Sequence, residues 1–302
     1  MPCRIRSLTE CASACRDVIK YDLSEIQNAA GIGVLEQPWH ILVSGNNDRG
    51  SAKGLKRHIW SGPIPDGAFY CIGKGIYMSS PEFSIVLLSA QLSLIEIVQL
   101  ICESCGRYVR DSSHPKGFYT RPAITNIEKI SSFVAKVKGA KGTKKLRRAF
   151  KYAFDNSYSP METAIALLAS MPVRMGGYGL PKPELNIRVD FPVEIARMAG
   201  KPYVKYDVYF RGYGIVVEYN SYDSHTGADR ISSDSKRNNA IGYLGEHVMT
   251  ITWDEVKRTA ECDNIMKQLA ALLDCKLAKP SESALAKRRL LRAAVLPPVM
   301  ER

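Results

Sequence analysis

The first half of the chain mixes apolar runs of strand length with apolar residues at helical spacing. The run His40-Ile-Leu-Val43 ends at the turn residues Gly45-Asn-Asn-Asp48 and predicts a strand. Ser80-Pro81-Glu82 predicts a helix start, because serine can cap free N–H groups and proline fits the first turn. We therefore expect strands over residues 39–44, 56–60, 68–72 and 75–78, and helices over 8–21, 23–30, 80–92, 94–103, 124–136 and 144–154.

The second half reads as one compact α/β unit. Val204, Tyr206, Val208 and Phe210 alternate with polar residues and predict a strand with one buried face, whereas the continuous run 215–217 predicts a more central strand. A helix that stops at Gly245 follows. The expected order is helix 160–169, strands 185–193, 203–210 and 214–219, helix 232–244, strand 247–252 and helix 254–273.

The length of 302 residues favours two domains rather than one. We expect a mixed α+β N-terminal domain over 1–155, an α/β domain over 156–278 and a basic tail over 279–302. Hydrophobic residues make up 45% of the chain, no apolar run is long enough for a membrane span, and no secretory leader is evident, so a soluble cytoplasmic protein is expected. The eight scattered cysteines fit reduced thiols. Cys102 and Cys105 have metal-ligand spacing, but a helical position fits them better than a zinc site.

A net charge of +12 favours polyanions as partners, with DNA the leading candidate. Two basic clusters stand out, although such runs are also typical of solvated helix faces. Lys144, Lys145, Arg147 and Arg148 are the candidate nucleic-acid-binding residues of the first cluster. That cluster also holds Lys136, Lys138 and Lys141, and the second holds Lys276, Lys279, Lys287, Arg288, Arg289 and Arg292.

Asp207 lies in the middle of one predicted strand and Glu218 near the end of the next, across the tight turn 211–214. Neighbouring strands would bring the two carboxylates together, and such a pair is costly unless a cation lies between them. Oxygen ligands of this kind suit Mg²⁺ or Mn²⁺, which can polarise a phosphate and activate water. The alternative is two exposed strand residues. The hydrolytic interpretation requires that the acids do not face opposite sides of the sheet and that no arginine fills the gap between them.

The residues that follow these two acids in the sequence also point to their function. Glu218-Tyr-Asn220 is followed by His225, by Asp234-Ser-Lys236-Arg237, and by a strand that ends in Thr252-Trp-Asp254. In combination, this arrangement resembles the PD-(D/E)XK nuclease superfamily, and within it the very-short-patch-repair-like endonuclease domains. The resemblance implies a three-layer restriction-endonuclease-like fold with a central mixed sheet in the order αβββαβα.

The resemblance also implies roles for individual residues. Asp207, Glu218 and the backbone carbonyl of Tyr219 would bind the metal ion, and Glu162 would contribute from the preceding helix, unless it serves only as a helix-capping residue. Asn220 departs from the family pattern, since it stands where a lysine or an acid is usual and an amide cannot act as a base. His225 becomes the candidate general acid or base, Lys236 could replace the missing lysine, and Arg237 would hold the DNA backbone.

The wider chain resembles bacterial proteins, common in actinobacteria, that join such a domain to an N-terminal half similar to abortive-infection antitoxins; that half would serve in recognition or regulation. The matching stretches include Ser159-Pro-Met-Glu162 and Gly176-Gly-Tyr-Gly179 through Asn186. Two functions follow as hypotheses. The first is a metal-dependent endodeoxyribonuclease, in phage defence or repair, with RNA left open as a substrate. The second is a catalytically inactive nuclease fold that binds DNA or serves as an antitoxin-like regulator with a partner protein.

Overall fold

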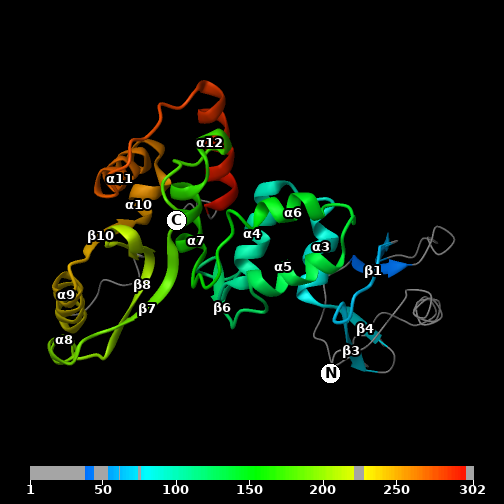
Figure 1. Cartoon of the computed structure of the whole chain (residues 1–302), viewed down its shortest axis with the longest axis horizontal. Coiled ribbons are helices and arrows are strands. Elements are labelled where there is room, and N and C mark those ends of the chain that lie inside the picture. The colour runs from blue at the N-terminus through cyan, green and yellow to red at the C-terminus, as the bar shows by residue number, and fades with distance from the viewer. Residues whose placement is uncertain (1–37, 44–53, 61, 74–75, 221–227, 297–302) are drawn as a thin grey trace. The chain divides into compact units, whose positions relative to one another are not determined.

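The computed structural model describes residues 38–43, 54–60, 62–73, 76–220 and 228–296. These residues form a mixed α/β structure, and the chain divides into two compact units (Figure 1). One unit comprises residues 1–93 with 128–148, and the other comprises 94–127 with 149–302. Segment 94–127 thus groups with the C-terminal half, so the compact units do not divide at residue 155. The three expected functional domains stay a prediction.

In its described residues, the first unit contains two small two-stranded sheets and three helices. Parallel strands β1 (Trp39–Val43) and β2 (Leu55–Ile59) pair with each other, as do antiparallel strands β3 (Phe69–Gly73) and β4 (Ile76–Ser79). Helix α3 (Pro81–Ser89) starts as predicted, with the Ser80 hydroxyl accepting a hydrogen bond from the Phe83 N–H at 3.2 Å. Helices α5 (Ile127–Lys136) and α6 (Thr143–Ala149) complete the unit. Fully buried Phe83 contacts the rings of Phe69 and Phe133 and lies in the core.

The second unit begins with α4 (Leu94–Cys105) and a short hairpin, β5 (Tyr108–Arg110) and β6 (Phe118–Thr120). The sequence predicted only a loop here, because three-residue strands are too short to show a periodicity. Tyr108 is fully buried, and its hydroxyl shares a 3.0 Å hydrogen bond with Thr163. This contact attaches the hairpin to the helix that precedes the main sheet.

The main sheet has four strands in the order β10-β9-β8-β7. Strands β7 (Glu184–Asp190), β8 (Tyr203–Phe210) and β9 (Ile215–Asn220) form an antiparallel meander, and β10 (His247–Thr252) joins β9 in parallel. Helix α7 (Pro160–Ser170) precedes the sheet, and all but its last residue is buried. The predicted bounds of β8 and β10 are confirmed, because both strands alternate strongly. The first strand is shorter than expected and gives way to α8 (Val193–Ala199).

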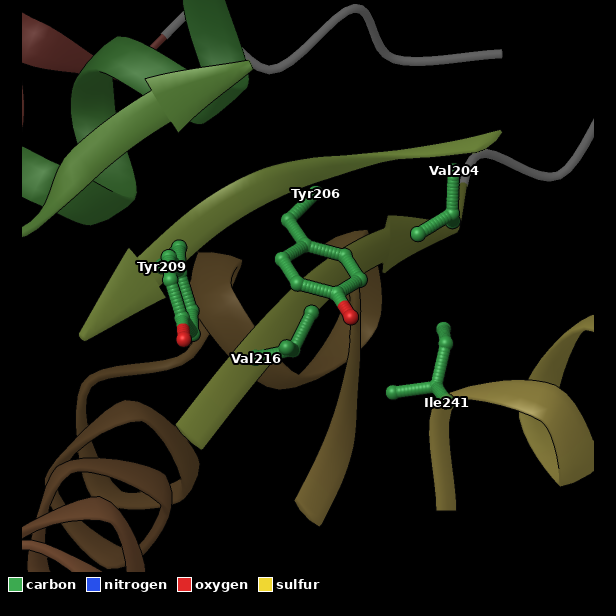
Figure 2. Close-up of a cluster of buried hydrophobic side chains, with 5 residues drawn as sticks. All are labelled: Val204, Tyr206, Tyr209, Val216 and Ile241. Atoms are coloured by element: carbon green, nitrogen blue, oxygen red, sulfur yellow. The ribbon is translucent and has the colours of Figure 1, made fainter. Parts of the chain in front are cut away.

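Helix α9 (Ala228–Tyr243) lies beside the sheet and packs against α8 and β10. Ile241 of α9 closes a buried cluster with Val204, Tyr206 and Tyr209 of β8 and Val216 of β9. Figure 2 shows the Tyr206 ring in the middle of these side chains. Lys205, between Val204 and Tyr206, points away from this cluster, and its amine contacts the Tyr158 hydroxyl just before α7 at 3.1 Å.

The predicted helix over 254–273 is interrupted at Arg258, giving α10 (Trp253–Lys257) and α11 (Thr259–Leu272). The region expected to be a basic tail contains a further helix, α12 (Glu282–Val295), which packs against α4, α7 and the short turn η2 (Val173–Met175). The sequence analysis predicted no helix over 282–295, because the basic residues obscure the apolar spacing of Ala284, Leu291 and Val295, which are all buried.

Two expectations lie outside the described residues: the helices over 8–21 and 23–30. Within the described part of the chain, no helix combines the length and apolar character needed to cross a membrane.

Candidate functional site

The two central acids lie where strands β8 and β9 stop pairing. The last paired residues are Val208 and Val217, and Asp207 and Glu218 are the next positions along the two strands. Beyond this point, hydrogen bonds to carboxyl side chains replace the backbone–backbone hydrogen bonds between β8 and β9. The Tyr219 N–H donates to Oδ2 of Asp207 at 3.0 Å, and the backbone of Asp207 is close enough to the Glu218 carboxyl group to lower its pKa slightly. The strands therefore hold the two carboxyl groups against each other.

Strand β7 is also irregular at this level. Its pairing with β8 follows one register from Glu184 to Asp190, except at Asn186, the position opposite Asp207. Asn186 has a φ of 49°, a left-handed conformation that asparagine tolerates better than most residues but that still carries strain. Its buried side-chain amide donates to Oε2 of Glu162 at 2.5 Å. No role was predicted for Asn186, although an asparagine between Leu185 and Ile187 interrupts an apolar strand.

Glu162 takes part in the start of its own helix and also lies beside the acid pair, while its metal-binding role stays a prediction. It caps its own helix: its N–H donates to the Ser159 hydroxyl at 3.2 Å, that hydroxyl donates to Oε1 at 3.0 Å, and the Tyr158 N–H donates to Oε2 at 2.8 Å. Glu162 is also buried and close enough to Asp207 for the two charges to interact. A capping function therefore does not remove Glu162 from the acidic site.

Burial raises the pKa of all three acids, and the charge of Asp207 adds to the rise at Glu162 and Glu218. Burial, followed by the charge of Asp207, raises the pKa of Glu162 to about 7 and that of Glu218 to about 7. Burial also raises the pKa of Asp207, against the stabilising N–H of Tyr219 and the charge of Arg237. The site therefore carries less negative charge near neutral pH than three ordinary carboxylates would, and it would gain from an added cation.

Arg237 of α9 supplies one cation to this site. Its Nη2 lies 2.7 Å from Oε1 of Glu218 and also donates to the carbonyl of Lys205 at 2.8 Å. Arg237 is one helical turn before Ile241, whose packing on the sheet fixes the approach of α9. The sequence analysis predicted that Arg237 contacts the DNA backbone. In the structure, its guanidinium is instead hydrogen-bonded to Glu218. The hydrolytic interpretation was predicted to fail if an arginine filled the gap between the two acids; the hydrogen bonds described for the Arg237 side chain go to Glu218 and the Lys205 carbonyl and not to Asp207.

The structure says less about the other residues that were predicted for this site. Lys236 is exposed, so Arg237 and not Lys236 brings positive charge to Glu218. Asn220 is half-buried at the end of β9, paired with Thr252. His225 lies outside the described residues, as does the side chain of Asp234.

A divalent ion fits the chemistry of the donor set, because carboxylate oxygens are its preferred protein ligands. Among the side chains that the structure describes, however, no group of three or more His, Cys, Asp or Glu is arranged to hold a metal ion. The preformed feature is the Asp207–Glu218 pair. Glu162 accepts three hydrogen bonds, two at Oε2 and one at Oε1, so only Oε1 has acceptor capacity left for a cation.

The basic clusters and the cysteine pair fall in different environments. Lys144, Arg147 and Arg148 are exposed on α6 in the first unit, and the Lys145 amine donates to the carbonyl of Leu92. In the second cluster, Arg288 and Arg292 are buried and bond backbone carbonyls, so the expected basic tail is partly structural. Burial raises the pKa of the Cys102 thiol to about 12, which disfavours the thiolate that zinc requires.

In comparisons with known proteins, no protein-family model, no curated protein and no solved structure matches this chain. The residues and their geometry therefore carry the functional argument.

Proposed function

We propose that this chain is a metal-dependent endonuclease of the PD-(D/E)XK type that hydrolyses phosphodiester bonds in DNA. One observation carries the proposal: Asp207 and Glu218 meet at the point where β8 and β9 part, and burial raises the pKa of both, with the charge of Asp207 adding to the rise at Glu218. Buried acids that repel one another without a structural need are typical of functional sites. The element order around them, with α7 before a meander and α9 before a parallel strand, supports the proposal.

Asp207 and Glu218 would hold the divalent ion, with the Tyr219 carbonyl as a further predicted ligand. A bound Mg²⁺ or Mn²⁺ would supply Lewis-acid chemistry at the scissile phosphate. The net reaction adds water across one P–O ester bond: the water oxygen bonds to phosphorus, and the departing sugar oxygen takes a proton. Glu162, with a pKa of about 7, is suited to exchange that proton at neutral pH, and His225 stays a predicted second candidate.

Arg237 fits the proposal as a cation that stabilises Glu218 while no divalent ion is present. Its charge lowers the pKa of Glu218 and of Asp207, against the effect of burial. A phosphate could then compete with Glu218 for the guanidinium, because both are anions that accept hydrogen bonds in the same geometry. The predicted contact with the DNA backbone would form in that way.

The same ion pair favours a second function. If Arg237 stays on Glu218, and Asn220 cannot act as a base, the domain would bind DNA without cleaving it and could regulate a partner protein. The discriminating property is metal-dependent turnover, since only the nuclease requires the carboxylates to be ionised and free to take a cation.

A cleavage assay on the full chain separates the two functions. Supercoiled plasmid and single-stranded RNA would be incubated with Mg²⁺, Mn²⁺ or EDTA, using the native protein, Asp207→Asn, and Glu184→Gln as the matched control. Glu184 is an acid of the same sheet that pairs with exposed Arg211 instead of lining the site. We expect metal-dependent nicking of DNA that falls on the order of 100-fold or more in Asp207→Asn alone. No turnover with either metal, or equal turnover in Asp207→Asn, would reject the nuclease.

A further inference from the structure

A pocket of about 550 Å³ lies at the end of the main sheet where β8 begins. Three cationic side chains line it, Lys201, Lys205 and Arg237, together with the rings of Phe191 and Tyr203. The described residues that line the pocket include no acid. Arg237 is paired with Glu218, but the two lysines have no acid beside them in the described lining, so the pocket favours an anion.

Next to the pocket, cationic side chains also lie over aromatic rings. The Arg188 guanidinium lies 4.0 Å from the centre of the Tyr203 ring, and Tyr203 remains 36% exposed. The Lys205 amine lies 5.0 Å from the centre of the Tyr158 ring, with Arg107 5.1 Å from the same ring. These pairs extend the cationic and aromatic surface along β7 and β8 to the start of α7.

We propose that this surface, the pocket with the Tyr203 and Tyr158 rings, binds an unpaired DNA strand next to the carboxylates. Lysine and arginine side chains neutralise phosphates, and exposed aromatic rings stack on bases of any sequence. Stacking needs a base whose face is free, which an intact duplex does not offer. A surface of cations alone would fit a duplex equally well, so the exposed Tyr203 ring, with the half-buried Tyr158 ring beside it, makes the unpaired strand the better match.

The position of the surface ties it to the acidic site, and in this respect the inference rests on the proposed function. Arg237 lines the pocket and also contacts Glu218. Lys205 precedes Asp207 by two residues on β8, a separation of roughly 6–7 Å along a strand. A strand whose phosphates contact Lys205 and Arg237 therefore has its next phosphate within reach of Asp207.

Binding can be measured without cleavage, so that failure of this inference is distinct from failure of the nuclease. A fluorescent 20-nucleotide oligo-dT and a duplex of the same length would be titrated with Asp207→Asn protein in EDTA, following anisotropy. We expect the single strand to bind on the order of tenfold more tightly than the duplex. Duplex binding that is equal or tighter overturns the inference, whether or not the native protein cleaves plasmid.

Substitutions inside and outside the pocket test where the single strand binds. Tyr203→Leu, which keeps an apolar side chain but removes the ring, should weaken single-strand binding on the order of tenfold, and Lys201→Gln, at an exposed position, should weaken it less. The controls are Tyr213→Leu and Lys267→Gln, exposed residues of the same unit that lie outside the pocket. Equal losses in variants and controls overturn the assignment. If Tyr203→Leu fails to fold by circular dichroism, Lys201→Gln against Lys267→Gln decides.

Discussion

Arg237 on helix α9 donates a 2.7 Å hydrogen bond to Glu218, a carboxylate that is only 6% exposed on strand β9. Nineteen positions separate the two residues, and the Ile241 packing one turn along α9 brings them together. The pair couples the charge of the acidic site to the position of the helix. It therefore connects stability, protonation and ligand binding in this part of the fold.

Arg237→Ala should destabilise the protein more at high pH than at low pH. Glu218 has a pKa of about 7, so at pH 8.5 the variant leaves a buried carboxylate without its partner, whereas at pH 5 Glu218 is neutral. We expect a loss of about 1–2 kcal/mol at pH 8.5, reduced by the partial exposure of Arg237, and much less at pH 5. Urea unfolding at both pH values measures this. The control is Arg211→Ala, which breaks an exposed pair with Glu184. A loss that does not change with pH would contradict the assignment.

The unfolding free energy should fall as pH rises from about 4.5 to about 7. The pKa values of Glu162 and Glu218 are raised from 4.5 to about 7 in the folded chain, so in this window the folded state binds more protons than the unfolded state. The stabilisation is complete below the lower value and is lost above the upper one. Glu218→Gln should show a shallower fall than the native protein. An unchanged slope in that variant would mean that Glu218 titrates normally.

Added Mg²⁺ or Mn²⁺ should raise the melting temperature at pH 8 and not at pH 5. Ionised carboxylates bind the cation, and below their raised pKa values protons compete with it. Differential scanning fluorimetry of the native chain and of Asp207→Asn checks this, with Glu184→Gln as the control. A metal effect that survives in Asp207→Asn would place the ion elsewhere in the chain.

Arg288→Ala should destabilise the C-terminal part of the fold, although Arg288 belongs to a predicted polyanion-binding cluster. Its guanidinium is 6% exposed, lies 3.0 Å from Asp263 and stacks 3.8 Å from the centre of the Tyr178 ring. Removing it takes the cation from Asp263, which keeps only the hydrogen bond of the Tyr178 hydroxyl, for a cost of about 2 kcal/mol. The neighbouring Arg289→Ala, at an exposed position, should change the unfolding free energy by under about 0.5 kcal/mol. Equal effects in the two variants would argue against a structural role for Arg288.

Gly177→Ala should be among the most damaging small substitutions. A Cβ at this position would lie 2.0 Å from the carbonyl oxygen of Met171, which is backbone and cannot move aside cheaply. We expect a loss of about 3 kcal/mol. Gly212→Ala is the control, since nothing lies within 4 Å of a Cβ there. A native-like melting temperature in Gly177→Ala would show that this turn can shift, and that the close packing of α7 and η2 is not required.

The local pattern of apolar and polar residues was sufficient to predict most of the helices and strands. Strands β8 and β10 have the predicted bounds, because alternation over six to eight residues reports the local buried face directly. The capping of α3 and α7 follows from Ser80-Pro81 and Ser159-Pro160 in the same way. The breaks at α8 and Arg258, and the helix α12, were not predicted, since basic residues and short lengths weaken the periodicity there.

The sequence by itself determined that the second half is an α/β unit and which acids stand on its neighbouring strands, because both properties depend on residues close together in the chain. Only the tertiary structure decided that Asn186 takes a left-handed conformation opposite Asp207, that Arg237 rather than Lys236 meets Glu218, and that Arg288 is buried. These outcomes depend on burial and on contacts between residues far apart in sequence. Burial and charge proximity set the protonation of the acids, and no local pattern contains either.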